Sequence, residues 1–286
     1  MLYNEKFTML LTETISDLQK TLQQAHNSGQ TIGLVPTMGA LHEGHLSLIK
    51  RARKENDLCV ISIFVNPTQF NNAEDLEKYP RTLEQDLQLV SDYVDIAFAP
   101  SVEEVYRVPA TEQYDFGPVA EVMEGPARPG HFNGVGIIVK RLFDWVQPTR
   151  AYFGEKDFQQ IAVIKTLVRQ CNLPVQIVPC PIVRETSGLA LSSRNRRLTE
   201  EERAISANIY RILKASTQLN TTNTEEIRQF VVKEIEKYDL FKIEYYEIVD
   251  DETLQPVADL NDSNGVVGCI TVWANNVRLI DNIRYK

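Results

Sequence analysis

The chain has 286 residues, of which 43% are hydrophobic, so it can bury a core in one large domain or in a domain with a smaller companion. Its 39 acidic residues outnumber its 30 basic residues and give a net charge of −9. This excess repels polyanions, which argues against nucleic acid as a partner and requires a local cluster of donors for any anionic ligand.

The cysteines and the N-terminal segment both bear on cellular location. The four cysteines form no close CxxC pair, and three of them lie in apolar runs, as expected for buried thiols in a reducing compartment. Residues 1–18 mix acidic with apolar residues and lack the basic start of a secretory signal. No window has the apolar length of a membrane span. We therefore expect a cytoplasmic protein with no membrane partner.

Up to about residue 185, short apolar runs alternate with segments of helical periodicity. Helices are predicted at 12–29, 41–56, 80–94, 131–148 and 156–172, and strands at 31–37, 57–66, 95–100, 151–154 and 175–183. Residues 108–130 are rich in turn formers and predict an excursion with short elements. This alternation predicts an α/β fold with a doubly wound, Rossmann-like parallel sheet that is covered on both faces.

The pattern changes beyond residue 185. Two helices are predicted at 199–216 and 222–238, followed by three strands at 242–250, 268–274 and 277–285. Helices followed by strands predict a smaller α+β domain. We therefore predict two domains, 1–185 and 186–286, with a hinge near residues 186–188.

The stretch PTMGALHEGHLSLI at residues 36–49 contains two of the four histidines, His42 and His45. If residues 39–42 open a helix, its first backbone N–H groups lack partners within the helix and attract an anion. Histidines at i and i+3 project from nearly the same face, and Gly44 keeps that face open. Each imidazole can then donate a proton or a hydrogen bond to a phosphate.

Two other interpretations of this turn stay open. An i,i+3 histidine pair can bind a metal, although no third ligand is evident nearby and the HExxH zinc motif is absent. Two surface histidines on an amphipathic helix are the usual explanation of HxxH alone. The stretch LSSRN at residues 191–195 favours phosphate binding over these two interpretations, because it offers two hydroxyls and a guanidinium after an apolar strand. An early HxGH turn with a late serine and basic loop resembles the HIGH and KMSKS elements of class I aminoacyl-tRNA synthetases and related nucleotidyltransferases.

Five stretches in order sharpen this resemblance: PTMGALHEGHLSLI, FVNPTQF, RPGHFNGV, YFGEKDFQQ and GLALSSRN. As a set, between residues 36 and 195, they resemble the pantothenate synthetase (pantoate–β-alanine ligase) family. The resemblance implies a carbon–nitrogen ligase of pantothenate biosynthesis. Pantoate attacks the α-phosphorus of ATP to give pantoyl adenylate and pyrophosphate, and β-alanine then displaces AMP. The resemblance also implies Mg²⁺ with ATP, a homodimer, and a C-terminal domain that acts as a lid.

The resemblance assigns roles to residues at matching positions. His45 matches the proton donor and His42 assists at the phosphates, while Gln69, Gln160 and Asn66 would bind pantoate and β-alanine. The residues that would bind ATP are Met38, Gly39, Ala40, Leu41, His42, Glu43, Gly44, His45, Gly154, Glu155, Lys156, Asp157, Val183, Leu191, Ser192, Ser193 and Arg194. No metal ligand is assigned.

Several of these residues have a simpler interpretation. Asp157 reads equally well as a helix N-cap, and Lys156 as a solvated surface lysine. His131 suits helix capping at least as well as a pocket wall, and Asp86 suits a solvated helical carboxylate better than a magnesium ligand.

Two positions depart from the family pattern. Leu191 stands where methionine is common, and Ser187 stands where an aspartate is expected. Leu191 keeps the apolar volume for adenine packing, whereas Ser187 alters how the loop is hinged.

Two alternatives to the ligase remain. A nucleotidyltransferase would keep the nucleotide on its product, and a nucleotide-binding regulator would catalyse nothing. Release of AMP and consumption of an amine separate the ligase from both.

Overall fold

The structure is a computed structural model that describes residues 9–286. It contains two compact units. The N-terminal unit comprises the chain up to Asp115 with residues 128–154 and 163–180, and the C-terminal unit comprises residues 116–127, 155–162 and 181–286. This division places residues 116–127, 155–162 and 181–185, all before the predicted boundary after residue 185, in the C-terminal unit. The lid role of that domain stays a prediction. Part of the predicted absence of a secretory signal falls on residues 1–8, which lie outside the described residues.

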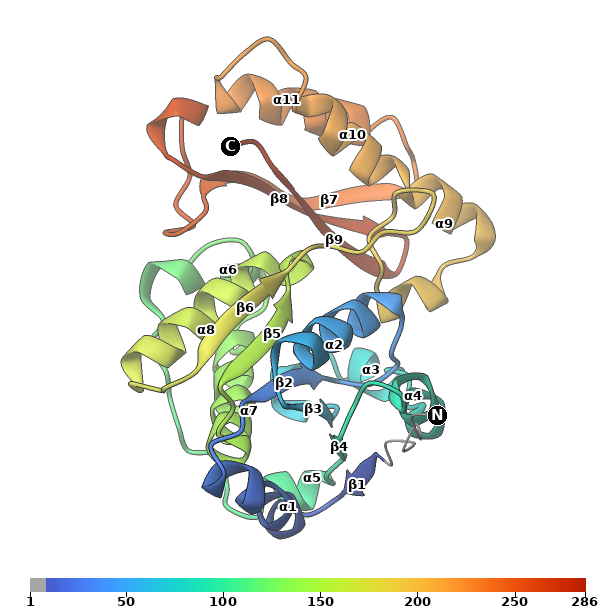
Figure 1. The fold of residues 1–286 in the computed structure, drawn as a ribbon. Helices are drawn as coiled ribbons and strands as arrows, with labels where there is room; N and C mark the ends of the chain where they lie inside the picture. The colour runs from blue at the N-terminus through green and yellow to red at the C-terminus, as the bar shows by residue number, and fades with distance from the viewer. Residues whose placement is uncertain (1–8) are drawn as a thin grey trace, which may run out of the picture. The chain divides into compact units, whose positions relative to one another are not determined.

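A six-stranded parallel sheet forms the centre of the N-terminal unit (Figure 1). The strand order is β1-β4-β3-β2-β5-β6, with β1 Leu10–Thr12, β2 Ile32–Thr37, β3 Leu58–Ile63, β4 Ile96–Phe98, β5 Arg150–Gly154 and β6 Gln176–Cys180. After β2 the chain proceeds outward through β3 and β4, and it returns to the other side of β2 with β5. The strand order therefore reverses between β2 and β5. Ligands of doubly wound sheets gather at this point, beyond the carboxyl ends of the strands.

Helices cover both faces of this sheet. On one face, α2 (Glu43–Glu55) packs through Leu48, Ile49 and Ala52 against alternate strand residues such as Val35 and Ile61. The strand residues in between point to the opposite face, where the Phe98 ring meets Trp145 of α7 (His131–Val146) with ring centroids 6.0 Å apart. Shorter or peripheral helices complete this part of the chain: α1 Ile15–Asn27, α3 Ala73–Glu77, α4 Leu83–Val90, α5 Val102–Val105 and the 3₁₀ turn η1 Pro67–Gln69.

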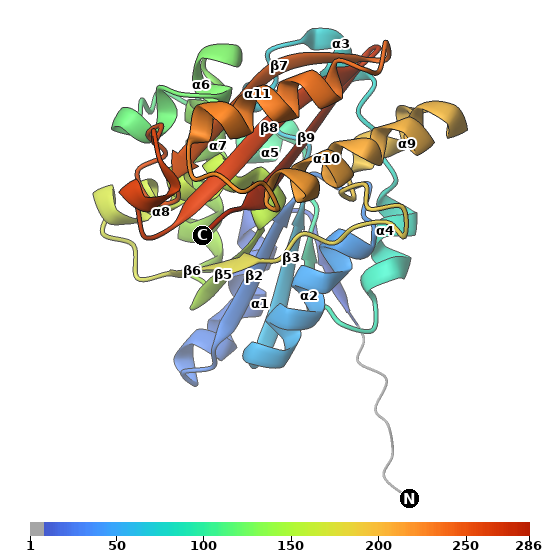
Figure 2. The ribbon, with the colours of Figure 1, turned by 90° about the horizontal axis from the view of Figure 1, so that it is seen from above.

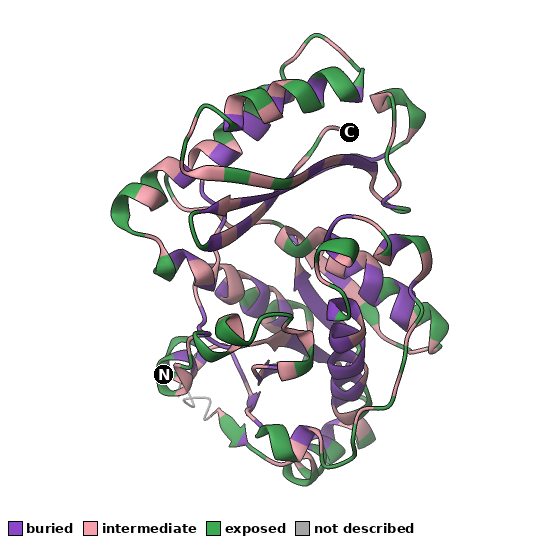
Figure 3. Ribbon diagram, turned by 180° about the vertical axis from the view of Figure 1, so that it is seen from behind, coloured by how far each residue is buried: buried purple, intermediate pink, exposed green. Residues whose placement is uncertain are grey.

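Most residues of α7 are buried, and the helix appears as a largely purple column in Figure 3. Gly134 on this helix lies against η1. A Cβ atom at this position would stand 2.6 Å from the Thr68 carbonyl carbon and 2.9 Å from the Gln69 backbone nitrogen. Only glycine therefore lets the two backbones approach so closely.

The C-terminal unit contains an antiparallel sheet in the order β7-β8-β9. Two helices, α10 and α11, pack across one face of this sheet (Figure 2), and Leu213, Val231 and Ile270 are among the residues of the core between them. The strands are β7 Phe241–Asp250, β8 Val266–Ala274 and β9 Val277–Arg284. The remaining helices and 3₁₀ turns of the chain are η2 Gly117–Ala120, α6 Glu124–Ala127, η3 Glu155–Asp157, α8 Phe158–Gln170, η4 Ser193–Arg197, α9 Glu200–Ser206, α10 Asn208–Ser216, α11 Thr224–Ile235 and η5 Leu260–Asp262.

The predicted fold class is confirmed, and each long helix and strand lies where periodicity placed it. One prediction was wrong: the helix at 199–216 is two helices, α9 and α10. The Asn208 side chain donates to the Ile205 carbonyl, which offers the backbone a partner outside the helical pattern at this break. The edge strand β1 escaped prediction because it has only three residues, and both Leu10 and Leu11 are exposed. No helix within residues 9–286 is long and apolar enough to cross a membrane.

Replacing Gly134 with alanine should destabilise the protein. Alanine favours a helix by about 1 kcal/mol over glycine, but its Cβ meets backbone atoms of η1 that have no rotamer by which to move away. Overpacking of this kind costs about 1–3 kcal/mol, so the net free energy of unfolding should fall in urea denaturation. Asp144→Ala on the same helix removes only an exposed ion pair with Lys140 and should cost less than about 0.5 kcal/mol. Equal stability of Gly134→Ala and the parent chain would contradict the close packing.

Candidate functional site

The HxGH turn begins where β2 ends. The Thr37 hydroxyl donates to the Ser62 carbonyl and accepts from the Gly39 N–H, which fixes the end of the strand. Gly39 has φ +78°, and a Cβ there would lie 3.1 Å from Asp86 and 3.2 Å from Ile63. Ala40 follows at φ 50°. Glycine adopts a positive φ readily, but the left-handed region is costly for Ala40, so this conformation needs support from its surroundings.

Asp86 of α4 supplies that support. Its two carboxylate oxygens accept the backbone N–H groups of Ala40 at 2.9 Å and Leu41 at 2.8 Å, and the Thr82 hydroxyl donates to it at 3.2 Å. Asp86 is only 2% exposed. The interpretation as a solvated helical carboxylate is therefore wrong, because the carboxylate is buried and bound to the turn. Asp86 is a positioning residue for the turn.

His42 and His45 cap α2 reciprocally. The Gly44 N–H donates to Nδ1 of His42 at 3.1 Å, and the His42 N–H donates to Nδ1 of His45 at 3.3 Å. The two rings lie with centroids 4.1 Å apart. A nitrogen that accepts from a backbone N–H carries no proton itself, so the neutral form of each ring has its proton on Nε2. The backbone thus selects the tautomer in which each imidazole is an Nε2–H donor.

The helix start does not offer the row of unpartnered amides that the sequence led us to expect. Asp86 takes the N–H groups of Ala40 and Leu41, and the two imidazoles take those of His42 and Gly44. These four N–H groups are therefore engaged within the protein, and the helix-dipole argument does not apply to them. The role of the imidazoles at a phosphate stays a prediction.

Gln69, in the 3₁₀ turn after β3, bonds through its side chain to Met38 of another segment and to Asn66 next to its own turn. Its side-chain amide donates to the Met38 sulfur and its carbonyl oxygen accepts from Asn66 at 3.2 Å. Asn66 is 1% exposed and also donates to the Gly134 carbonyl at 3.1 Å. The Tyr106 hydroxyl donates to Asn66 as well, and burial raises the pKa of Tyr106, so this phenol stays a donor. The segments after β2 and β3 thus meet within this unit.

His131 and Arg128 hold the backbone of Gln69. The Gln69 carbonyl lies 2.8 Å from Nδ1 of His131 and 3.2 Å from Nη2 of Arg128. Arginine only donates, so Nε2 of His131, 3.0 Å from Arg128, is the acceptor and Nδ1–H donates to the carbonyl. The cap of α7 is Gly130, without a side-chain bond, so the interpretation of His131 as a cap is wrong. His131 instead positions the glutamine that was predicted to bind pantoate.

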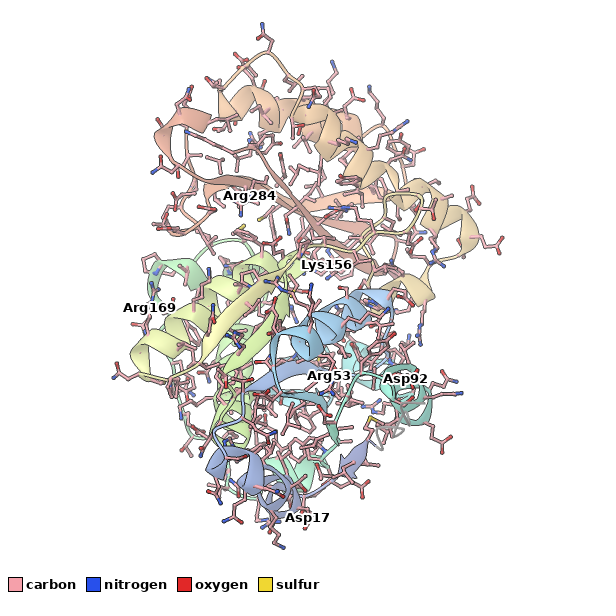
Figure 4. The ribbon with its side chains drawn as sticks, viewed as in Figure 1. Asp17, Arg53, Asp92, Lys156, Arg169 and Arg284 are labelled. Atoms are coloured by element: carbon pink, nitrogen blue, oxygen red, sulfur yellow. The ribbon has the colours of Figure 1, made fainter. Side chains whose placement is uncertain are left out.

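In the C-terminal unit, the EKD segment forms η3, and its Lys156 is labelled in Figure 4. The Lys156 side chain is 17% exposed, and its Nζ lies 3.3 Å from Asp157. Lys156 is therefore no solvated surface lysine. Asp157 is the last residue of η3, and its N-cap role stays a prediction. The Asn282 side chain donates to the carbonyls of Glu155 at 2.8 Å and Lys156 at 3.3 Å, a contact that no sequence pattern indicated.

The two glutamines after this segment have different surroundings. Gln159 is 5% exposed, and its amide donates to the carbonyls of Val119 and Val122 while its oxygen accepts from the Glu124 N–H. Gln159 therefore anchors the 116–127 excursion. Gln160 is half-buried in the first turn of α8, and its ligand-binding role stays a prediction.

Residues 183–191 form a hairpin that leads into the SSRN loop. Arg184 pairs with Ala190, and the Leu191 N–H donates to the Val183 carbonyl at 3.0 Å. At the tip, Gly188 has φ +98°, and the Leu189 N–H donates to the Ser187 hydroxyl at 3.4 Å. Serine thus supplies an acceptor where the family pattern expects a carboxylate. The half-buried Leu191 follows the hairpin.

The SSRN loop is a 3₁₀ turn capped by Ser192, whose oxygen accepts the Arg194 N–H at 3.3 Å. Ser193 is 7% exposed. Asn195 is 4% exposed and donates to the Ala190 carbonyl at 3.0 Å and to Glu185 at 3.1 Å. Asn195 fixes both ends of the loop, and sequence analysis had assigned it no role.

Among residues 9–286 no three side chains of His, Cys, Asp or Glu gather into a metal-binding group. The four cysteines are free thiols, and three of them are buried.

Comparison with known proteins agrees with this geometry. A family model described as pantoate-beta-alanine ligase matches residues 10–284. The pantothenate synthetases of Bacteroides thetaiotaomicron and Porphyromonas gingivalis are each 54% identical over 280 residues, which cover 97% of this chain and 99% and 100% of theirs.

Solved structures are similar too. That of pantothenate synthetase from Thermus thermophilus has a TM-score of 0.91 at 42% identity, covering 97% of this chain and 99% of the other. The pantoate-beta-alanine ligase of Francisella tularensis, complexed with beta-gamma ATP and beta-alanine, has a TM-score of 0.81 at 37% identity over 97% of this chain and 98% of the other. With a match along nearly its whole length, this chain belongs to the pantoate–β-alanine ligase family.

Proposed function

We propose that this chain condenses (R)-pantoate with β-alanine at the expense of ATP, releasing AMP and pyrophosphate, as a step of pantothenate biosynthesis. Family membership over residues 10–284 supports the activity. The observation that carries the mechanism is the reciprocal cap of His42 and His45, which leaves both rings as Nε2–H donors. Two neutral donors side by side suit a reaction in which negative charge grows on a phosphate.

In the first step, the pantoate carboxylate attacks the α-phosphorus of ATP and pyrophosphate leaves. His45 donates from Nε2 to the phosphate oxygens, and His42 donates beside it. The protein must align two anions that repel each other, so positioned donors contribute more than a protein nucleophile would. In the second step, the β-alanine amine attacks the acyl carbon, and AMP leaves with the electron pair of the broken C–O bond.

Pantoate and β-alanine are assigned to Gln69 and Gln160, whose amides both donate and accept. Asn66 was predicted to contact these substrates directly. Its burial and its bonds to Gly134, Gln69 and Tyr106 favour a positioning role instead. Met38, next to the Gln69 amide, keeps its place in the ATP-binding set.

The proposed nucleotide contacts come from separate segments of the chain. In the turn after β2, residues 38–45 contact the phosphates, chiefly through the imidazoles. Lys156 neutralises phosphate charge, Asp157 accepts from the ribose hydroxyls, and Gly154 and Glu155 line the nucleotide. Val183 meets adenine through its backbone. Leu191, Ser192, Ser193 and Arg194 complete the binding set, the hydroxyls and the guanidinium as donors to the triphosphate.

Mg²⁺ is proposed to arrive bound to ATP. Among the described residues, no three His, Cys, Asp or Glu side chains gather into a metal-binding group. In nucleotide-binding enzymes, Mg²⁺ usually keeps several waters and binds substrate phosphate oxygens. When bound, the ion neutralises part of the triphosphate charge. A homodimer and a cytoplasmic location complete the proposal, and free thiols suit a reducing compartment.

Isotope exchange tests the activity. Labelled pyrophosphate should exchange into ATP only when pantoate is present, because the adenylate forms before β-alanine is needed. Adding β-alanine should then release AMP and pantothenate in equal amounts. Product that retains the nucleotide would identify a nucleotidyltransferase instead. Binding of ATP without any exchange would identify a regulator.

His45→Ala should lower the pantoate-dependent exchange rate by about two to three orders of magnitude, as for the loss of a positioned donor. The substitution also removes the acceptor of the His42 N–H, so circular dichroism and a melting curve should accompany the kinetics. His26→Ala serves as the control. This histidine lies in α1 and has no proposed role at the site, so the variant should catalyse exchange at the rate of the parent protein. A rate within about threefold of the parent enzyme would remove His45 from the mechanism.

Asp86→Asn should lower exchange at least about tenfold. Asparagine keeps the size of aspartate, but its NH₂ group faces a backbone N–H where the carboxylate had an acceptor, so the turn at Gly39 and Ala40 loses support. Glu84→Gln changes an exposed carboxylate of the same helix and serves as the matched control. If both variants keep full exchange, Asp86 does not position the turn.

A further inference from the structure

Two consecutive polar residues, Asp281 and Asn282, interrupt the apolar pattern of β9. They stand opposite Ile270 and Cys269 of β8, and they are only 6% and 9% exposed. Successive strand residues point to opposite faces, so the two side chains reach different neighbours. Burying a carboxylate and an amide is costly unless both are fully hydrogen-bonded, and both residues have specific partners.

Asp281 binds Arg184 at the base of the 183–191 hairpin. The guanidinium donates through Nη1 at 2.6 Å and Nη2 at 2.8 Å to the two carboxylate oxygens. Burial raises the pKa of Asp281 and the Arg184 charge opposes that rise, as expected for a paired buried carboxylate. The same guanidinium stacks 3.6 Å from the centroid of the Tyr210 ring and donates to the Gly188 carbonyl at 3.2 Å. Arg184 is thus held from three sides.

Asn282 binds the backbone of the other segment. Its amide donates to the carbonyls of Glu155 and Lys156, so one side chain spans two consecutive residues of η3. The Asn282 carbonyl in turn accepts from Arg184 at 3.4 Å, and its N–H donates to Asp281 at 2.8 Å. One strand therefore joins two segments, at residues 155–157 and 183–191, that lie far apart in sequence.

We propose that Asp281 and Asn282 are positioning residues that fix the two nucleotide-binding segments of the C-terminal unit in one geometry. Asn282 orients Lys156 through its backbone, and Asp281 orients Val183 and Leu191 through Arg184. Both segments, 155–157 and 183–191, are thus attached to the same strand of the antiparallel sheet. This inference rests on the proposed function, because it assumes that Lys156 and the hairpin contact ATP.

A purely structural role makes a different prediction. Loss of a structural contact lowers the melting temperature and affects all substrates alike. Loss of a positioning contact weakens ATP binding selectively, since the segments that it orients are assigned to ATP and not to pantoate. A positioning role therefore raises the ratio of KM for ATP to KM for pantoate, whereas a structural role leaves this ratio unchanged.

The experiment uses the full chain with Asn282→Ala, Lys156→Ala and the double variant. The Kd for ATP is measured by calorimetry, and KM for ATP and pantoate by steady-state kinetics. Asn282→Ala should raise the Kd and KM for ATP about tenfold, with KM for pantoate within about twofold of the parent enzyme. Asn220→Ala, an exposed asparagine of the same unit, should change neither.

The double variant decides whether Asn282 acts through Lys156. If it does, Asn282→Ala should add less than about twofold to the Kd of Lys156→Ala, because the group that it positions is gone. Independent, multiplying effects would overturn the proposal, as would equal rises in both KM values. Asp281→Asn, which keeps the shape but weakens the hold on Arg184, should also raise KM for ATP and not for pantoate. An unchanged KM for ATP in both single β9 variants would overturn it too.

The parent protein separates failure of this inference from failure of the proposed function. If the parent chain shows no pantoate-dependent exchange and no ATP binding, the proposed function itself is wrong. If the parent chain is active and the β9 variants match it, only the positioning role is wrong.

Discussion

The exchange of backbone hydrogen bonds between His42 and His45 is the interaction on which the proposed chemistry depends. Each ring accepts one N–H of the helix start through Nδ1, so protonation at that nitrogen would break the cap. The helix therefore favours neutral rings that present Nε2–H. A site built this way holds its donors ready before substrate arrives, which is the condition for effective electrostatic stabilisation. The same bonds would couple helix formation to the proposed chemistry, because the proposed catalytic groups are also the cap.

A chain with a net charge of −9 must still bind a triphosphate and a carboxylate together. Buried carboxylates near the assigned ligands would oppose this unless their charge is engaged elsewhere. Asp86 is engaged by two backbone N–H groups and a hydroxyl, and Asp281 by a bidentate guanidinium. The neutral donors stabilise the Asp86 carboxylate without cancelling its charge, whereas the Arg184 guanidinium compensates the charge of Asp281.

Periodicity was sufficient to predict the sheet and its covering helices, because these features follow from local pattern. It was not sufficient for residues whose partners lie far away in sequence. Asp86 contacts the turn 46 and 45 residues before it, and Asn282 contacts η3 127 and 126 residues before it. On a strand or helix, either residue looks like an ordinary polar position. His131 was misread for the same reason, since its partner is a carbonyl 62 residues away.

These positioning residues share a chemistry. Asn66, Asp86, Asn195 and Asn282 are all buried, and each binds backbone groups of a predicted ligand-binding loop. A short side chain with two polar atoms loses little rotamer freedom and can bind two backbone groups at once. Loops lack the regular bonds of helices and strands, so such residues replace them at the points where the loop must hold one shape. The residues proposed to contact ligands can then have long side chains that are charged or that both donate and accept hydrogen bonds, because buried Asn and Asp side chains hold their backbones in place.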